Sequence, residues 1–441
     1  MTQVATSPET YAAQFARFKQ GAVFSGPLAS LRDDAFLCFD RLGFPTTRLE
    51  DWRFTNVAPI AETPFLAQTE SVDYTRAALD GLNLPRIGGP ELVFVNGLFN
   101  PGLSSTAGLP AGVRVRSLAA VLADEPEAVT PHLGRLARVE GQAFTALNTA
   151  FVRDGAVVEV PAGVVVQVPI QLQFVTSSGV APVLSLPRVL VLAGADSQVT
   201  VVESHTGTAA TPYLSNAVTE VSVGDNAVVD HYSVVREADV AFRVGSLHAH
   251  LGRASNFSSH TITLGGAIVR NEAQVVLGGE GGVCTLNGLY LANDRQLVDN
   301  QTTIDHAQPH CDSHELYKGI LAGRSRGVFN GKIIVRLDAQ KTDAKQSNKA
   351  LLLSEDAQIT SKPQLEIFAD DVKCTHGATV GQLDSESLFY LRSRGLSKEQ
   401  ARQLLVHAFA ADLLRHIRVA EVRAQLDDQL LERLPVGDVG L

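Results

Sequence analysis

The sequence contains few cysteines, few aromatic residues and no excess of positive charge. Its 441 residues include only four cysteines, Cys38, Cys284, Cys311 and Cys374. Four cysteines in so long a chain do not make a disulfide framework, and none of them forms a Cys-x-x-Cys pair. A net charge of −10 disfavours nucleic-acid binding, because proteins that bind nucleic acids present a basic surface to the phosphates. With 45% hydrophobic and 19% charged residues, the composition is that of an ordinary globular protein.

Targeting and membrane-spanning signals are also missing. The first residues lack the basic and apolar regions of a secretion signal. The longest apolar stretch, residues 157–175, is interrupted by Glu159 and Gln167 and broken by two prolines, so it does not predict a membrane span. We therefore expect a cytoplasmic protein with neither a membrane nor a nucleic acid as partner.

Catalytic signatures are absent as well. The sequence has no G-x-S-x-G elbow, no H-E-x-x-H pair and no G-x-G-x-x-G fingerprint. Residues 327–333 come nearest to a phosphate-binding loop, but this segment is one residue too short and has Ile333 where a Mg²⁺-binding Ser or Thr is needed. We interpret it as a turn. The sequence thus predicts no nucleotide site and no enzyme; any ATP chemistry must come from a partner.

Both ends of the chain have helical patterns. In the N-terminal region, residues 1–90, apolar residues recur at three- to four-residue intervals over 9–20 and 31–42, and Gly43 then provides a stop signal. In the C-terminal region, residues 391–441, Ser397 and Gln400 match a capping box at the start of a helix.

The C-terminal helix carries an apolar stripe that includes Leu405, Phe409 and Leu413. Such a stripe most often packs on its own domain. As an appended helical module, it is also a reasonable docking platform for another protein. Both interpretations remain open at this point.

The centre of the chain, residues 91–390, has the texture of a β-structure with a helical insertion near 117–147. The turn-marked segments 194–196, 224–226, 252–254 and 278–280 start 30, 28 and 26 residues apart. Runs such as 198–203 and 227–232, which follow these turns, are predicted strands. This period favours the rungs of a β-solenoid, in which each rung buries its inner face only by stacking on its neighbours. Turn signals at 8–12 residues also occur and leave a β-sandwich as the alternative.

Two groups of residues could bind metal. In the first, His306, His310 and His314 would share one face if the segment were helical, with Cys311 beside them, which gives ligands suited to zinc or iron. The β texture argues against a helix, and in a turn these could be satisfied polar groups. Cys311 follows Cys284 by 27 residues, close to one rung. We therefore expect these two cysteines to stack on neighbouring strands.

The second group is Cys374 and His376. Residues two apart in a strand point the same way, so this thiol and this imidazole would share a face. Two ligands cannot complete a four-coordinate site, so a second chain would have to supply the others. The preceding Asp370 and Asp371 would point oppositely if extended, which weakens a two-carboxylate hydrolase.

Motifs around this second group make the chain recognisable. The segment Lys373-Cys374-Thr375-His376-Gly377 and its flanks resemble the SufB/SufD family of iron–sulphur cluster assembly proteins, on its SufD side. Further stretches with the same resemblance are residues 44–53, 317–320, 329–332, 340–344, 362–367, 369–381 and 388–395. The resemblance spans nearly the whole chain and is densest from about 299 to 409.

The resemblance implies a right-handed parallel β-helix flanked by helical regions. It implies a heterodimer with SufB, the two β-helices meeting edge to edge, and docking of the ATPase SufC on the C-terminal module. It places His376, with Cys374 beside it, at the SufB interface, where a nascent cluster is built and shared with SufB rather than held alone. A reduced flavin is associated with the whole complex, although no residue here can be assigned to it.

SufB itself is the nearest alternative. SufB-type chains carry a cysteine in the segment that aligns with 345–348 and a glutamate after the histidine. Here that segment has no cysteine, and Gly377 follows His376. Both departures favour the SufD side and remove a principal cluster ligand.

The resulting hypothesis is a non-catalytic scaffold subunit that serves iron delivery or cluster building. A β-helix carbohydrate-active enzyme would need two facing carboxylates and a groove lined with aromatic residues. The sequence has a single Trp and 6% aromatic residues, which disfavours this hypothesis. A free-standing metal-binding protein would use His306, His310, Cys311 and His314. Whether the isolated chain forms a homodimer is left open by the sequence.

Overall fold

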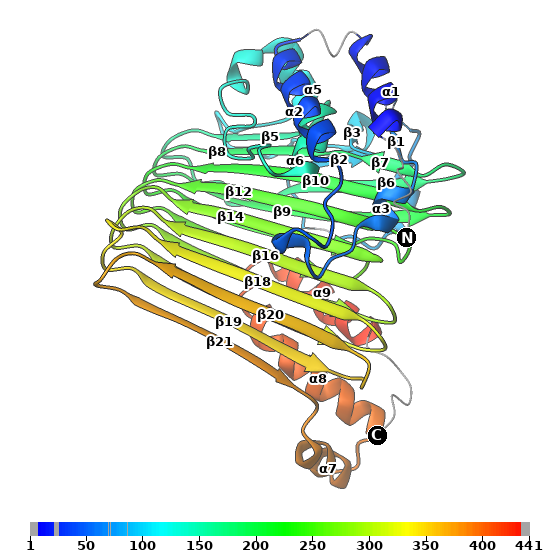
Figure 1. Cartoon of the computed structure of the whole chain (residues 1–441), viewed down its shortest axis with the longest axis vertical. Coiled ribbons are helices and arrows are strands. Elements are labelled where there is room, and N and C mark those ends of the chain that lie inside the picture. Colours follow the sequence, from blue (N-terminus) through cyan, green and yellow to red (C-terminus); the bar gives the residue numbers. More distant parts are fainter. Residues whose placement is uncertain (1–7, 22–25, 69, 71, 86, 434–441) are drawn as a thin grey trace.

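A parallel β-solenoid of about eight turns forms the centre of the molecule in the computed structural model (Figure 1). The structure describes residues 8–21, 26–68, 70, 72–85 and 87–433. The prediction of a mostly-β solenoid between helical ends is confirmed, and the sandwich alternative is wrong.

Each turn of the solenoid contributes one strand to each of two sheets. Sheet A consists, in spatial order, of β20 (Gln358–Ile367), β18 (Arg326–Val335), β16 (Leu297–His306), β14 (Ile268–Leu277), β12 (Phe242–Leu251), β10 (Tyr213–Val223), β8 (Arg188–Ala193), β5 (Gly155–Val160) and β4 (Arg114–Ser117), with β7 (Val183–Ser185) beside β10 and β1 (Leu66–Ala67) beside β7. Sheet B consists of β21 (Lys373–Gly381), β19 (Asp343–Leu352), β17 (Asp312–Leu321), β15 (Val283–Ala292), β13 (Asn256–Thr263), β11 (Val228–Arg236), β9 (Gln198–Ala209), β6 (Ile170–Ser178), β2 (Glu91–Val95) and β3 (Leu98–Phe99).

Neighbouring strands pair in phase, so equivalent side chains form columns that run through the stack. Val199, Val229, Phe257 and Cys284 are successive partners in sheet B, and all four are buried in the main hydrophobic cluster inside the solenoid. Because side chains alternate between the two faces of a strand, alternate residues line the interior and the rest face outward.

The corner that leads from sheet A to sheet B repeats one conformation. Asp196, Asn226, Ala254, His310 and Lys341 all have a positive φ, between 53° and 63°. This left-handed conformation is costly for residues other than glycine, and Asn and Asp tolerate it best. The amide of each corner bonds to the next, as from Asn226 to the Arg253 carbonyl at 2.8 Å. The predicted turns at 194–196, 224–226 and 252–254 are confirmed as these corners.

Helices cover the first rungs. They comprise α1 (Pro8–Lys19), α2 (Ala29–Leu42), the 3-10 turn η1 (Glu50–Trp52), α3 (Ala58–Glu62), α4 (Arg76–Asp80), the 3-10 turn η2 (Pro101–Leu103), α5 (Leu118–Asp124), the 3-10 turn η3 (Pro126–Ala128) and α6 (Ala143–Ala150). Phe39 of α2 and Phe144 of α6 are buried in one cluster with Leu214 and Phe242 from the outer face of sheet A. The first strands end the parallel pattern, since β4 pairs antiparallel with β5 and β3 with β2.

Three further helices follow the last strand: α7 (Ser385–Ser393), α8 (Lys398–Leu414) and α9 (Ala420–Arg433). Leu413 and Leu426 pack in one cluster with Ile262 and Ile320, outward residues of sheet B. The capping box at the start of α8 is confirmed. Since α7 begins at Ser385, the domain boundary predicted at 391 falls inside a helix. In the described part of the chain, no helix is both long and apolar enough to cross a membrane.

Candidate functional site at the open end of the solenoid

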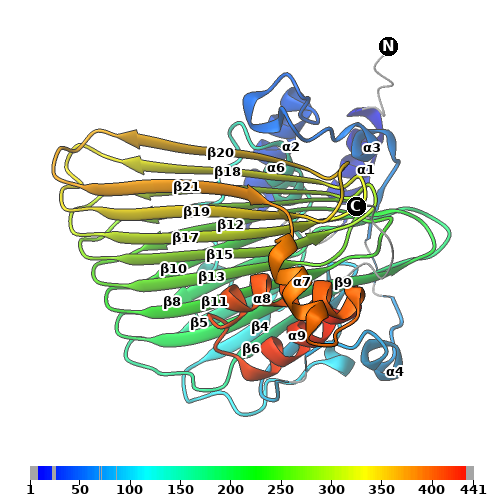
Figure 2. The same cartoon turned by 90° about the horizontal axis from the view of Figure 1, so that it is seen from below.

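The last rung of the solenoid, formed by β20 and β21, is open. Within the part of the chain that the structure describes, each of these strands is paired on one side only, β20 with β18 and β21 with β19. Seen from below, the two strands lie uncovered at the end of the stack, while α8 and α9 lie over other strands of sheet B (Figure 2). Among the residues of β21, all but Cys374 are exposed.

The edge of β21 presents unpaired backbone groups. The amide of Lys373 donates to the carbonyl of Thr342, so Lys373 faces the neighbouring β19 side. In a parallel strand, alternate residues direct both their N–H and C=O groups to the same side. His376 and Ala378, which have the opposite parity, therefore direct theirs to the open side. Such an edge is a template for pairing with another chain.

Apolar side chains surround this edge. Ile367, Phe368 and Val380 are 39%, 61% and 54% exposed. Two of them belong to the last strands, and Phe368 directly follows β20. Exposed apolar side chains beside unpaired backbone groups are typical of a surface that another protein covers.

Cys374 and His376 share one face of β21, as their spacing predicted, and the register with β19 makes this the inward face. Cys374 is half-buried and packs against a small cluster inside the last rungs that includes Ile333 and Leu365. This burial raises the pKa of its thiol, so the protonated form is favoured. His376 is exposed at the open end. The rung thus offers one thiol and one imidazole on a surface that a second chain could complete.

Two buried polar residues beneath His376 were missed by the sequence reasoning. Gln346 on β19 is the register partner of His376, and Glu315 on β17 is the register partner of Gln346. Gln346 Nε2 donates a hydrogen bond of 2.7 Å to Glu315 Oε2. Burial raises the pKa of Glu315 to about 7. The strand alternation of 312–321 and 343–352 could have placed both residues inside, but the register between them needs the fold.

Gly331 makes room for this pair. A Cβ atom at Gly331 would lie 2.3 Å from Gln346 Nε2, so only glycine leaves space for the amide. Gly331 is an inward residue of β18, and the whole segment 327–333 lies in that strand. Its interpretation as a turn is therefore wrong, because the glycines serve close packing inside the solenoid rather than a change of chain direction.

The four residues of the other predicted metal group do not come together. His306 is buried at the end of β16 with Nε2 2.9 Å from Ser313 Oγ, whereas His310 is the exposed left-handed corner residue and His314 is exposed on β17. Cys311 Sγ donates to the Gly279 carbonyl at 3.3 Å. The segment is strand, corner and strand, as its β texture indicated, so the shared face that a helix would have given these histidines does not form. Within the residues described, no group of three or more His, Cys, Asp or Glu side chains could hold a metal ion.

The two central cysteines are offset from the predicted stacking. Cys284 pairs in register with Ser313, whereas Cys311 lies two residues earlier, in the corner. Both are nevertheless buried in the same hydrophobic cluster. The sequence spacing of 27 residues was close to one rung, but adjacent rungs differ in length by a few residues.

The predicted docking stripe on α8 mostly faces the chain's own solenoid. Leu413 is fully buried against sheet B, and Phe409 is partly buried there. Lys318 of β17 fixes this contact: its Nζ donates to the Phe409 carbonyl at 2.8 Å and lies over the Phe409 ring. Leu405 is half-buried. The stripe therefore anchors the C-terminal module on the solenoid. The exposed apolar residues of this module are Phe389 and Tyr390 of α7 and Leu404 of α8.

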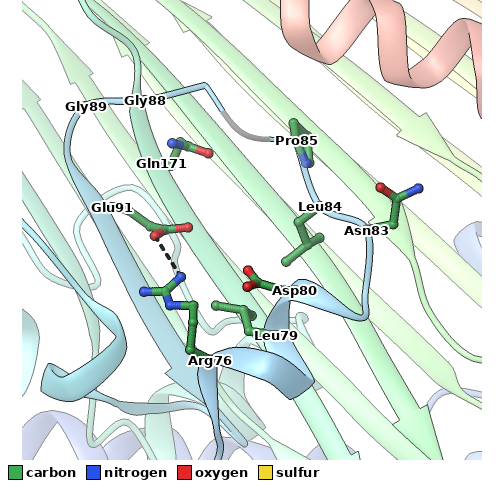
Figure 3. Close-up of a pocket in the computed structure, with 10 residues that line it drawn as sticks. All are labelled: Arg76, Leu79, Asp80, Asn83, Leu84, Pro85, Gly88, Gly89, Glu91 and Gln171. Atoms are coloured by element: carbon green, nitrogen blue, oxygen red, sulfur yellow. Dashed lines mark hydrogen bonds and ion pairs between the residues drawn. The ribbon is translucent and has the colours of Figure 1, made fainter.

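A separate hollow of 520 Å³ lies near the start of sheet B, between the loop after α4 and the beginning of β2 (Figure 3). Arg76 projects into it and forms an ion pair with Glu91 at 3.5 Å. The Arg76 guanidinium also donates to the Leu103 carbonyl at 2.5 Å. Its charge is thus engaged within the chain, and the hollow is remote from the last rung.

The fold and its last rung together define a class of protein: a parallel β-solenoid, covered at its start, that presents a cysteine and a histidine at an open end. Two family models match. The SufBD core domain of the SUF system for FeS cluster assembly matches residues 174–409, and the SufBD protein N-terminal region matches residues 7–172. The chain belongs to the SufBD family of iron–sulphur cluster assembly proteins.

Individual relatives agree with this assignment. An iron–sulphur cluster assembly SufBD family protein of Synechocystis is 35% identical over 422 residues, 92% of each chain. The iron–sulphur cluster assembly protein SufD of Escherichia coli is 30% identical over 90% of this chain and 91% of its own. The protein of the same name from Bacillus subtilis is 27% identical over 86% and 87%.

Proposed function

We propose that this chain is a cytoplasmic, non-catalytic scaffold subunit for iron–sulphur cluster assembly. In this proposal its open rung pairs with the corresponding edge of a SufB-type chain, and His376 contributes an imidazole to a nascent cluster at the seam. The observation that carries the proposal is the uncovered last rung, which presents His376 beside unpaired backbone groups.

The chemistry of the end suits this role. Thiolate and imidazole are ligands that iron accepts, and both must be deprotonated to bind it. The imidazole of His376 is exposed and so accessible to iron, whereas burial raises the pKa of the Cys374 thiol and disfavours its thiolate. We therefore assign His376 the principal role and Cys374 a secondary one. The remaining ligands come from the partner, so the cluster is shared.

The C-terminal module serves as the docking platform for a SufC-type ATPase. Because Leu413 faces the solenoid, the docking contacts are assigned to the outward residues Phe389, Tyr390 and Leu404. The ATPase supplies the nucleotide chemistry. Lys318 of β17 forms an ion pair with Asp412 and donates to the Phe409 carbonyl, and these two contacts hold α8 on sheet B.

The experiment replaces His376 by alanine in the complex with a SufB-type and a SufC-type partner. We expect cluster formation to fall strongly and the melting temperature to stay unchanged, because the side chain is exposed. His314→Ala is the matched control, since His314 is an exposed histidine on β17 of the same sheet. Cluster formation at the wild-type rate in the His376 variant would rule out the assigned role.

A carbohydrate-active enzyme is less well supported. Of the two candidate carboxylates, Asp371 is engaged by Lys341 across the corner, and its backbone amide donates to Gln340 Oε1 at 2.9 Å. The single tryptophan, Trp52, is buried with its ring 3.8 Å from the guanidinium of Arg270. Neither the Asp371 carboxylate nor the Trp52 ring is therefore available to bind a sugar.

A further inference from the structure

The residue beneath His376 has an unused hydrogen-bond acceptor. The Gln346 side chain is 3% exposed, and its Oε1 is buried without a hydrogen-bond partner. A buried amide oxygen without a donor destabilises the folded chain, because the oxygen has given up its hydrogen bonds to water and gained none in return. Such a cost is ordinarily avoided, so this oxygen calls for a donor that the described residues of the chain do not supply.

The orientation of the Gln346 amide is fixed by its neighbours. Its NH₂ group donates to Glu315 one rung below, and the missing side chain of Gly331 leaves the space that the amide fills. With the NH₂ group committed to Glu315, the carbonyl branch is turned away from this carboxyl group. Asn348, the next inward residue of β19, donates its NH₂ to Ser361 Oγ at 2.9 Å, and it makes no hydrogen bond to Gln346 Oε1.

His376 is the nearest strand neighbour on the open side. Gln346 and His376 are register partners on adjacent parallel strands, which lie about 4.8 Å apart, and their side chains share the inward face. An imidazole that ligates a metal through one ring nitrogen nearly always donates its other N–H to an acceptor, which fixes the tautomer and the ring orientation.

We propose that Gln346 is the positioning residue for His376: in the assembled pair of chains its Oε1 accepts the imidazole N–H and so presents the other ring nitrogen to iron. Glu315 and Gly331 hold the Gln346 amide in the orientation that this requires. The inference rests on the proposed function of His376, and it adds residues from three consecutive strands (β17, β18 and β19) to the site.

The test measures binding of Fe²⁺ by anaerobic equilibrium dialysis of the complex with a SufB-type partner. Gln346→Met keeps the size of the side chain but removes the acceptor, and we expect Fe²⁺ affinity to fall by about tenfold or more. Gln364→Met is the matched control, because Gln364 lies on the outward face of β20 and donates to Asn330. The control should leave the affinity unchanged.

An exchange variant separates positioning from folding. Glu315→Gln combined with Gln346→Glu reverses the donor and the acceptor within the pair but keeps an oxygen beside His376. We expect it to recover most of the affinity that Gln346→Met loses. Recovery of the melting temperature without recovery of affinity would make Gln346 structural only and overturn the inference.

The outcomes also separate this inference from the proposed function. Wild-type affinity in Gln346→Met, with weakened binding in His376→Ala, would refute the positioning role alone. Wild-type affinity in His376→Ala would refute the proposed function, and with it the need for a positioning residue.

Discussion

The two ends of the solenoid differ in how the polypeptide treats the edge of a sheet. At the start, antiparallel strands and helices cover the first rungs, and even charged groups are sealed inside: Arg188 and Glu220 are fully buried and form an ion pair at 2.5 Å. At the other end, a ten-residue strand and a nine-residue strand are left unpaired on one side. The chain can evidently cover an edge with helices, yet its last three helices pack elsewhere.

The last rung is therefore not open for lack of helices that could cover it, because three helices follow it in the sequence and pack elsewhere. Helices α8 and α9 bury their apolar residues on the outer face of sheet B rather than on the end of the stack. An uncovered edge carries a risk of unwanted association, which proteins normally avoid. Its retention here therefore favours a partner that uses the edge.

The largest expected effect is the loss of stability when the buried ion pair at the covered end is broken. Glu220 Oε1 accepts from Arg188, and its two carboxylate oxygens also accept backbone amides, including those of Gly134 and Ala137. Replacing Glu220 by alanine leaves a buried guanidinium unpaired, which should lower the free energy of unfolding by about 3–5 kcal/mol. Urea denaturation measures this loss. Glu366→Ala near the open end, where the pair with Lys332 is solvated, is the control; an equal loss in both would contradict the comparison.

The next effect concerns pH and Glu315, two rungs from the open end. Its pKa is about 7 in the folded chain and 4.5 is the ordinary value, so the folded state binds the proton more tightly. The contribution to stability is full below pH 4.5, falls as the pH rises to 7 and is lost above it. This change amounts to about 3 kcal/mol. Glu315→Gln should remove that part of the pH dependence, as denaturation at pH 5 and pH 8 would reveal; an unaltered pH profile would mean that Glu315 is ionised throughout.

A smaller effect sharpens the contrast at the edge itself. Ala378→Pro removes an N–H group on the open side of β21 and leaves the pairing with β19 intact. We expect the affinity for a SufB-type partner to fall by at least about tenfold, because a ladder bond is lost and the ring obstructs the approaching strand. Copurification with a tagged partner measures it, and Ala378→Ser serves as the control. Retained pairing would show that the partner does not use this edge.

The smallest effect concerns the ion pair between Lys341 and Asp371 at the last corner. Both side chains are more than half exposed. Such pairs contribute little, so Asp371→Asn should leave the denaturation midpoint almost unchanged. A shift as large as that of Glu220→Ala would show that the open end is held together as tightly as the covered one.

Much of the fold could be predicted from the sequence because its signals are local and repeated. The corners recur once per rung with residues that tolerate a positive φ, such as Asp196 and Asn226. The capping box at Ser397 needs only neighbouring residues. The shared face of Cys374 and His376 follows from strand alternation alone.

The failures share one cause: they depend on distance through the fold. His310 looked like a ligand but is a corner residue, since nothing in the spacing of the histidines reveals where a rung turns. The contact between Gln346 and Glu315 joins residues 31 apart, and rung length varies along the chain. Periodicity placed Leu413 on an apolar stripe but could not say whether that stripe faced this chain or another.

The in-phase stacking of the strands also sets the unit in which this molecule can change in length. Deleting one residue within β19 would turn its inward side chains, Gln346 among them, to the outside. Deleting a whole turn, corner to corner, would instead shorten the stack while each remaining column kept its order. This architecture therefore tolerates a change in length when complete turns are inserted or deleted.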